Sequence, residues 1–270
     1  MSDICVIIPM FGKEEYTRKC VELTIKNAGM PIDILVVDDG SPVPFKDTNV
    51  TQLGTPINIL RLDKNSGYTN ATNQGILWCG DKYKYVHTLN NDTEPTENFI
   101  KVLYDIMEAD KTIGIASSVR KYDRPGEYNY ELYGMDLIMG WQICTVDKPT
   151  ESILDCNWVP ICSALIRVEM LRYVGILDRR MINHCSDNDL CVRCKMDGWR
   201  VVVCGDSLVF HHHEVTTKGS PLCNIHGDQK ILLEKITGLK YKELMAVLPI
   251  SVEDNTYGDL TFTVYKKEKK

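Results

Sequence analysis

The sequence predicts an α/β fold with a mostly parallel central sheet flanked by helices. Three observations lead to this prediction: short apolar stretches alternate with helix-like stretches, acidic clusters directly follow apolar stretches, and neither an internal repeat nor a Gly/Ser-rich linker interrupts the pattern. Short continuous runs of β-branched residues are typical of strands buried on both faces of a parallel sheet. Strands that alternate with helices build such a sheet, and its ligands bind at the carboxyl ends of the strands.

The first half of the chain supplies four strands and two helices. The expected strands cover 5–9, 34–37, 57–61 and 84–89, and the expected helices cover 14–27 and 69–79. Gly29 follows the first helix, and glycine is a common stop signal at that position.

The second half is less regular. We expect a strand over 158–167, a short helix over 168–174, a helix over 187–197, strands over 200–204 and 207–210, and a helix over 227–236. Because no linker divides the chain, we expect one domain over 1–225, with a first half over 1–95 and a second half over 96–225. A C-terminal helix and tail over 226–270 would follow it.

Composition excludes several classes of protein. Of the 270 residues, 44% are hydrophobic and 25% are charged, which is the globular average and excludes disordered, collagenous and coiled-coil chains. The net charge is −6, so the chain has no general attraction for nucleic acid. A polyanion would have to be held by a local site or by a metal.

The start of the chain and its cysteines indicate a compartment. Met1 leads directly into an apolar strand without the features of a signal peptide, and no apolar run approaches the roughly 18 residues that cross a bilayer. The eleven cysteines are an odd number spread through apparent core segments, as a reducing compartment tolerates. We therefore expect a cytoplasmic protein without a transmembrane segment, whose thiols are reduced.

Two clusters of polar residues follow predicted strands. Asp38 and Asp39 precede Gly40, and a carboxylate there can accept hydrogen bonds from a nucleobase or a ribose. Asn91 and Asp92 follow the fourth strand, where one carboxylate can hold a hard divalent cation if substrate phosphates supply further ligands. Each cluster taken alone is more typical of a polar turn.

Two further clusters lie in the second half. Asp187 and Asp189 open a predicted helix, where one acid caps the helix and complements its dipole, and the other is free to act as a general base. His211 begins a run of three histidines after a predicted strand, and an imidazole near carboxylates suits Mn or Zn. Cys191 and Cys194 form a C-x-x-C, but no second such pair accompanies them, so packed thiols are favoured over structural zinc.

The order of these motifs resembles the family 2 glycosyltransferases of the GT-A fold, and is closest to their rhamnosyltransferase-like members. The resemblance covers about residues 4–217. It is carried by seven segments in the family's order: 5–9, 36–41, 65–75, 89–93, 155–167, 174–178 and 186–193.

The resemblance implies an activity and a set of site residues. The activity is inverting transfer of a sugar, of the hexosyl type, from a UDP-, dTDP- or GDP-sugar to a hydroxyl of a glycan or glycoconjugate, as in polysaccharide biosynthesis, with a divalent cation (Mn or Mg). Asp187 would be the general base, and Asp92 and His211 would bind the metal. The residues expected at the donor are Pro9, Asp38, Asp39, Asn65, Gly67, Asn73, Asn91 and Asp92.

Two departures from the family's motifs keep an alternative open. Asn90 stands where the D-x-D motif has its first acid, and Ser186 replaces the usual glutamate beside the base. A catalytically weak module that binds a nucleotide sugar or a glycan is therefore the second hypothesis, since a fold does not fix a function. A nucleotidyltransferase is disfavoured, because Phe11-Gly12-Lys13 is a poor substitute for a Gly-rich basic loop.

Overall fold

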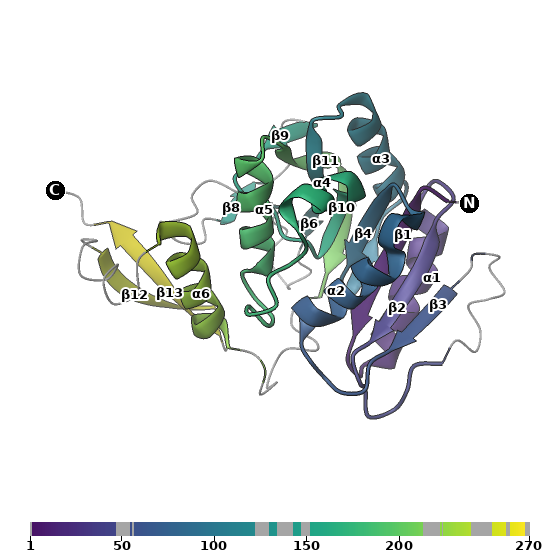
Figure 1. The fold of residues 1–270 in the computed structure, drawn as a ribbon, viewed down its shortest axis with the longest axis horizontal. Helices are drawn as coiled ribbons and strands as arrows, with labels where there is room; N and C mark the ends of the chain where they lie inside the picture. The colour runs from purple at the N-terminus through teal and green to yellow at the C-terminus, as the bar shows by residue number, and fades with distance from the viewer. Residues whose placement is uncertain are drawn as a thin grey trace.

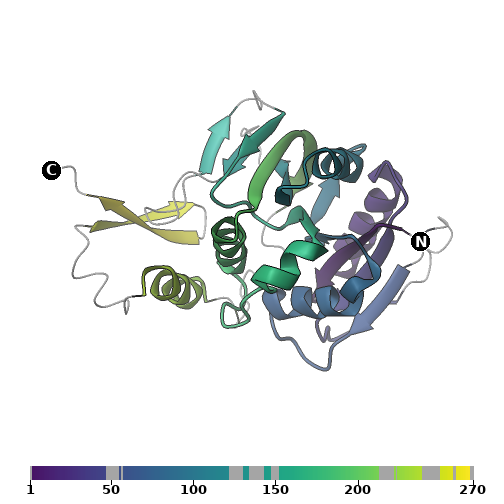
Figure 2. The same ribbon diagram turned by 45° about the horizontal axis from the view of Figure 1, so that its top comes forward.

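The computed structural model describes residues 2–46, 55, 57–121, 152–212, 222 and 224–238, and the backbone of residues 130–133, 143–146, 250–257 and 260–267. A single large sheet crosses the molecule, and helices cover both of its faces (Figures 1 and 2).

The sheet has the strand order β3-β2-β1-β4-β10-β6-β11-β5. These strands are β1 (Ile4–Met10), β2 (Asp33–Asp38), β3 (Ile57–Arg61), β4 (Tyr85–Leu89), β5 (Thr93–Pro95), β6 (Ile113–Lys121), β10 (Ser163–Arg167) and β11 (Arg200–His211). Neighbours pair in parallel except at β10, which is antiparallel to both β4 and β6, and at the short edge strand β5. Three short strands extend it: β7 (Tyr130–Tyr133), β8 (Ile143–Val146) and β9 (Ile153–Asp155).

Alternate residues of the central strands enter two separate cores. Ile7 of β1 packs with α2 (Tyr68–Cys79), α4 (Val168–Val174) and α5 (Ser186–Met196) on one face. Val6 and Ile8 pack with α1 (Glu14–Asn27) and α3 (Phe99–Ala109) on the other face. Because successive strand residues point to opposite faces, a strand that is apolar throughout has to be covered on both sides.

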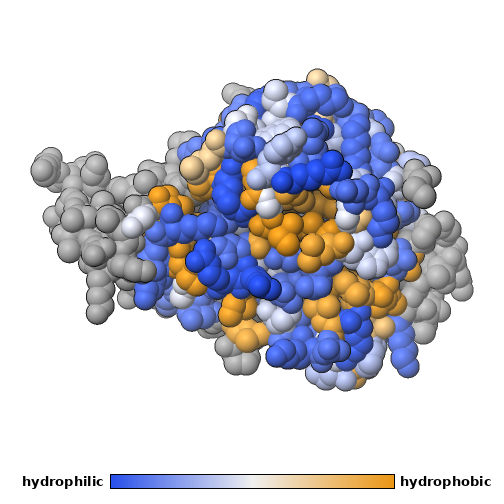
Figure 3. Space-filling model, viewed as in Figure 1, coloured by the Kyte–Doolittle hydropathy of each residue, from blue (hydrophilic) through white to orange (hydrophobic). Residues whose placement is uncertain are grey.

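The outer surface of the layer that contains α2 and α4 is partly apolar. Figure 3 shows hydrophobic residues gathered in the middle of this view, where α2 and α4 lie in Figure 1. Leu77 of α2 is 60% exposed and Tyr173 of α4 is 69% exposed.

A row of buried polar side chains crosses four strands. Nε2 of His87 in β4 lies 3.3 Å from the hydroxyl of Ser163 in β10, which lies 2.9 Å from that of Ser118 in β6. Ser118 in turn contacts Ser207 of β11 at 2.8 Å, and Ser207 donates to the carbonyl of Phe99. Burial lowers the pKa of His87 to about 3, so the ring is neutral. The row fixes the relative register of these strands from within the core.

The predicted α/β architecture is confirmed, with differences in the second half. The strand expected over 158–167 comprises only Ser163–Arg167; Trp158 and Val159 are buried because their loop packs into the core, so their apolar character reflects burial alone. The two strands expected over 200–210 are one strand with a register shift between Cys204 and Leu208. Strands β5 to β9 and helix α3 were not predicted.

The C-terminal region contains more than a helix and a tail. Helix α6 (Ile225–Thr237) confirms the predicted helix. Much earlier in the chain, a 3-10 turn, η2 (Gly80–Lys82), follows α2. The residues read as a tail include an antiparallel hairpin of β12 (Ile250–Tyr257) and β13 (Leu260–Lys267). Within the described ranges, no helix combines the length and the apolar character that a membrane span requires.

Candidate active site

Asp38 ends β2 and closes the turn that follows. Its carboxylate accepts hydrogen bonds from the backbone N–H groups of Ser41 (2.8 Å) and Phe45 (3.1 Å), and it is paired with the guanidinium of Arg61. Burial raises the pKa of Asp38, but these hydrogen bonds outweigh burial and leave the pKa below its ordinary value. Asp38 therefore stabilises the turn that presents its neighbour.

Asp39 points toward the segment before α2. Its carboxylate accepts from the backbone N–H and the hydroxyl of Ser66 (3.0 and 2.7 Å) and from the N–H of Gly67 (2.9 Å). Here burial outweighs the hydrogen bonds and raises the pKa. Gly40 makes this approach possible, because a Cβ on Gly40 would lie 2.5 Å from the carbonyl carbon of Lys64.

Asn65, Gly67 and Asn73 shape the same segment. Asn65 Oδ1 accepts from the N–H of Gly67 at 3.1 Å. Gly67 has a φ of 90°, and a Cβ there would lie 2.4 Å from a methyl group of Ile182. The amide of Asn73 bonds both to the N–H (3.0 Å) and to the carbonyl (2.8 Å) of Leu177, so it ties α2 to the loop after α4.

Pro9 and Asn91 lie at the carboxyl ends of two neighbouring strands. Pro9 pairs in register with Val37 of β2, beyond the last residue of β1 that pairs with β4. The amide nitrogen of Asn91 donates to the hydroxyl of Thr17 in α1 at 3.0 Å. Both residues build the edge of the sheet at which Asp39 and Asp92 lie.

Asp92 and His211 are brought together from β4 and β11. Nε2 of His211 lies 3.1 Å from Oδ1 of Asp92 and 3.2 Å from the amide of Asn90, and both Asp92 and His211 are buried. Arg120, at the end of β6, donates to Nδ1 of His211 at 3.3 Å. The imidazole thus has three polar neighbours: Oδ1 of Asp92 is an acceptor, and Nδ2 of Asn90 and the guanidinium of Arg120 are donors.

The donor set fits a divalent cation. A carboxylate and an imidazole converge, and Oδ1 of Asn90 beside them is a buried acceptor for which the described residues provide no hydrogen-bond partner. Among those residues no group of three or more His, Cys, Asp or Glu side chains could hold a metal, so further ligands would come from a substrate or from water. His213, the third histidine of the run, lies outside the described residues.

Asp187 opens α5. Cys185, the residue before the helix, has a left-handed φ of 63° and provides no side-chain cap. The carboxylate of Asp187 accepts from the N–H of Asn188 at 2.9 Å, and burial raises its pKa to about 6. A carboxylate with such a pKa is suited to accept a proton near neutral pH.

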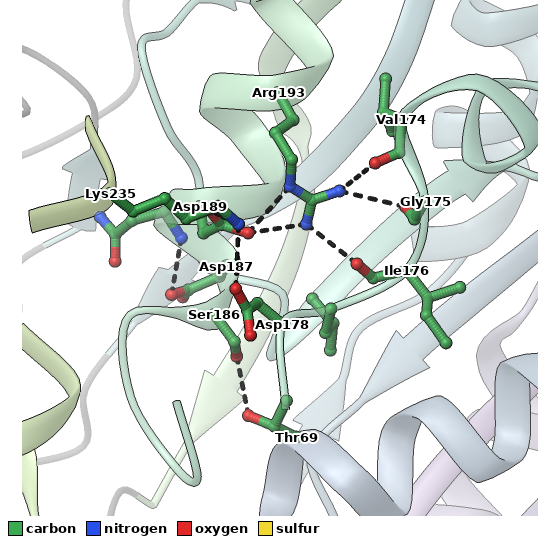
Figure 4. A network of polar contacts seen from close by, with 12 residues as sticks. Thr69, Val174, Gly175, Ile176, Asp178, Ser186, Asp187, Asp189, Arg193 and Lys235 are labelled. Atoms are coloured by element: carbon green, nitrogen blue, oxygen red, sulfur yellow. Dashed lines mark hydrogen bonds and ion pairs between the residues drawn. The ribbon is translucent and has the colours of Figure 1, made fainter. Parts of the chain in front are cut away.

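Asp189 has a different environment. Its carboxylate is paired with Arg193 at 2.8 Å and with Lys235 at 2.6 Å (Figure 4). Arg193 also donates to the carbonyls of Val174 and Ile176, so it joins α5 to the loop after α4. Asp189 is thus committed to the framework, while Asp187 is not.

Asp187 and Asp92 are connected by three residues that the sequence did not single out: Arg120, Cys162 and Tyr68. The guanidinium of Arg120 lies 3.6 Å from Sγ of Cys162, and its positive charge lowers the pKa of Asp187. After burial, the negative charges of Asp187 and Asp92 both contribute to the raised pKa of Tyr68. The sequence offered a signal only for Arg120, which lies near the end of the strand 113–121, where the preceding residues carry no charge.

The cysteines with described side chains are all buried and free. This holds for Cys5, Cys20, Cys79, Cys156, Cys162, Cys185, Cys191, Cys194 and Cys204. Burial raises the pKa of Cys194 to about 12 and that of Cys191 well above its ordinary value, so both remain thiols.

Comparison with solved structures shows the fold. The structure of GalNAc-T7 with UDP, GalNAc and Mn2+ matches with a TM-score of 0.63 and 14% identity, over 80% of this chain and 45% of that one. The structure of TarS 1–349 from S. aureus matches with a TM-score of 0.58 and 14% identity, over 78% and 60%. Both neighbours have the predicted GT-A fold.

Comparison of sequences shows the family. Glycosyltransferase GlyG of Streptococcus pneumoniae is 27% identical over 137 residues, 49% of this chain and 44% of that protein. The pre-mycofactocin glycosyltransferase of Mycobacterium tuberculosis is 25% identical over 215 residues, 78% of this chain and 43% of that protein. The chain thus spans less than half the length of these relatives. The model of the family "Glycosyl transferase family 2" matches residues 5–170, more than half of the chain, and the chain belongs to this family.

Proposed function

We propose that the protein is an inverting, metal-dependent glycosyltransferase that moves a sugar from a nucleoside diphosphate sugar to a hydroxyl of a glycan or glycoconjugate. One observation carries the proposal. Arg120 contacts His211 and Cys162 while its charge acts on Asp187, which supports placing the proposed metal-binding pair and the proposed base in one site. Membership of the family supports the same reaction class.

On the donor side, the proposal assigns the nucleoside to the turn at Asp39. The carboxylate already orders the segment at Ser66 and Gly67, and a nucleobase or ribose would use its remaining lone pairs. Asp38 and Asn73 act through this framework, because their polar atoms already have partners within the chain.

The diphosphate would lie against Asp92 and His211. A divalent cation bound there, Mn or Mg, would act as a Lewis acid on the leaving group. The cation would take the place of the direct contact between His211 and Asp92. The neighbour GalNAc-T7 was crystallised with UDP and Mn2+, which supports this assignment.

On the acceptor side, Asp187 would take the hydroxyl proton. The acceptor oxygen then attacks the anomeric carbon while the bond to the diphosphate breaks on the opposite face. A single displacement of this kind inverts the configuration of the anomeric centre. Positioned proton transfer of this kind contributes about 10²–10⁴ to a rate.

The test is a donor screen that also distinguishes the alternative. The protein is incubated with Mn2+ and a panel of nucleotide sugars and glycan acceptors, and both released nucleoside diphosphate and glycosylated product are measured. Transfer with inverted product stereochemistry supports the proposal. Tight nucleotide-sugar binding without turnover across the panel would favour a binding module. The variant Asp206→Asn changes an exposed acid of β11 and serves as a control, because it should behave in this screen like the unmodified protein.

A further inference from the structure

We propose that Asp228 in α6 is a positioning residue that holds the loop 182–184 in the place required by both the donor segment and Asp187. Asp228 lies beyond the residues matched by the family and beyond the boundary at 225 that the sequence suggested. The inference rests on the proposed function. It makes α6 part of the catalytic unit, and Figures 1 and 2 place α6 beside α5.

The carboxylate of Asp228 binds three successive backbone N–H groups. Oδ1 accepts from Ile182 at 3.0 Å, and Oδ2 accepts from Asn183 at 3.0 Å and from His184 at 2.9 Å. Asp228 is only 2% exposed. Hydrogen bonds from N–H groups to an ionised carboxylate are about twice as strong as those between neutral groups, so this contact orders the loop firmly.

The loop held by Asp228 in turn holds the donor segment. The carbonyl of Ile182 accepts from the N–H of Thr69, and Oδ1 of Asn183 accepts from the N–H of Tyr68, each at 3.0 Å. Gly67 packs against Ile182 and donates to the carboxylate of Asp39. Chain contacts therefore run without interruption from α6 to the turn assigned to the nucleoside.

The same loop leads directly into the helix of the base. It ends at Cys185, whose carbonyl accepts the first helical hydrogen bond, from the N–H of Asp189 at 3.0 Å. The hydroxyl of Ser186 is bonded at 3.0 Å to that of Thr69, as Figure 4 shows. A shift of the loop would thus move Asp187 and the donor segment relative to each other.

A second attachment of α6 lies at its other end. Nζ of Lys235 lies 3.0 Å from Asp178 and 2.6 Å from Asp189. Both ion pairs bind side chains outside the loop 182–184: Asp178 lies in the segment after α4, and Asp189 lies in α5. Asp228, which is buried and bound to the backbone, is therefore the residue that decides where the loop lies.

The experiment compares two variants of the loop contact with a control. Asp228→Asn removes the charge, and Asn183→Ala removes the contact to Tyr68 without leaving a buried carboxylate unpaired. Asp110→Asn is the control, because Asp110 binds the N–H of Thr112 and lies outside the site. We measure kcat and the donor KM well below the unfolding temperature, together with amide hydrogen exchange of the segments 66–69 and 186–189.

For both test variants we expect kcat to fall by about 10–100-fold, since a misplacement of about 1 Å can cost that much, with a smaller change in donor KM. Exchange should accelerate in both segments together, whereas the control keeps the kcat and the exchange rates of the original protein. A folded Asp228→Asn protein with unchanged kcat, or faster exchange at 182–184 alone, would overturn the inference. If Asp228→Asn does not fold, Asn183→Ala decides in the same way. If the unmodified protein shows no transfer activity, the proposed function is refuted. The hydrogen-exchange data would still test whether Asp228 holds the loop 182–184.

Discussion

Replacement of Asp187 by asparagine should remove activity and at the same time stabilise the fold. Asparagine keeps the shape of the side chain and an oxygen that can accept from the N–H of Asn188. It cannot take a proton from the acceptor, so turnover should fall by about 10²–10⁴. Nucleotide binding should survive, because the donor contacts are assigned to Asp39 and Asp92.

The gain in stability follows from the pKa of Asp187. Burial raises this pKa from its ordinary value of 3.8 to about 6. Two pKa units correspond to about 3 kcal/mol, and partial contact with solvent reduces the expected effect to about 1–3 kcal/mol. Because the folded state binds the proton more tightly, the ionised carboxylate destabilises the fold above about pH 6. Below about pH 4 both states are protonated and the difference vanishes.

Urea denaturation of both proteins at about pH 8 and about pH 4 checks this reasoning. The asparagine variant should have the higher free energy of unfolding at pH 8 and nearly the same one at pH 4. The transfer activity of the unmodified protein should fall below about pH 6, as the proposed base Asp187 becomes protonated. A variant that transfers sugar normally, or whose stability relative to the unmodified protein does not depend on pH, would refute the argument.

Three further predictions test other parts of the molecule. Asp92→Ala, like an excess of chelator, should abolish metal-dependent nucleotide binding in calorimetry; unchanged affinity would speak against the metal site. His87→Gln should make the fold more resistant to acid, which denaturation midpoints at several pH values will show. Burial lowers the pKa of His87 to about 3 in the folded protein, so the unfolded protein takes up a proton that the folded protein does not. The unmodified fold therefore loses stability as the pH falls below about 6.5. Gly75→Ala should lower stability by about 1–3 kcal/mol in thermal denaturation, because its Cβ would lie 2.4 Å from a methyl group of Ile7; an unchanged melting temperature would contradict this packing.

What the sequence could predict depends on how local the signal is. Helix α1 was predicted with its observed bounds, because its apolar positions and Gly29 lie in one short stretch. The meeting of Asp92 with His211 could be expected only through the family resemblance, since 119 residues separate them.

The contacts that the sequence could not predict join distant segments through the backbone. Asp228 binds main-chain N–H groups of residues about 45 positions earlier, and any residue type except proline offers such a group. Arg120 was missed for a related reason, because its role comes from Cys162, just before β10, and His211 in β11, and not from its own strand. Helix α3 was a missed local signal: Phe99, Leu103 and Met107 are buried at helical spacing.

The reversed direction of β10 has a consequence for engineering the protein. Because β10 runs antiparallel to β4 and β6, its beginning lies at the edge where those two strands end, and the carbonyl of Cys162 accepts from the N–H of Asn90. Its far end carries Arg167, which is buried and donates to the carbonyls of Ile113 and Met107 on the opposite edge. A graft meant to change acceptor choice should therefore exchange the residues that enter β10, 156–162, and leave the residues that follow it intact. A graft of the residues after β10 would alter the opposite edge of the sheet, where Arg167 is bound.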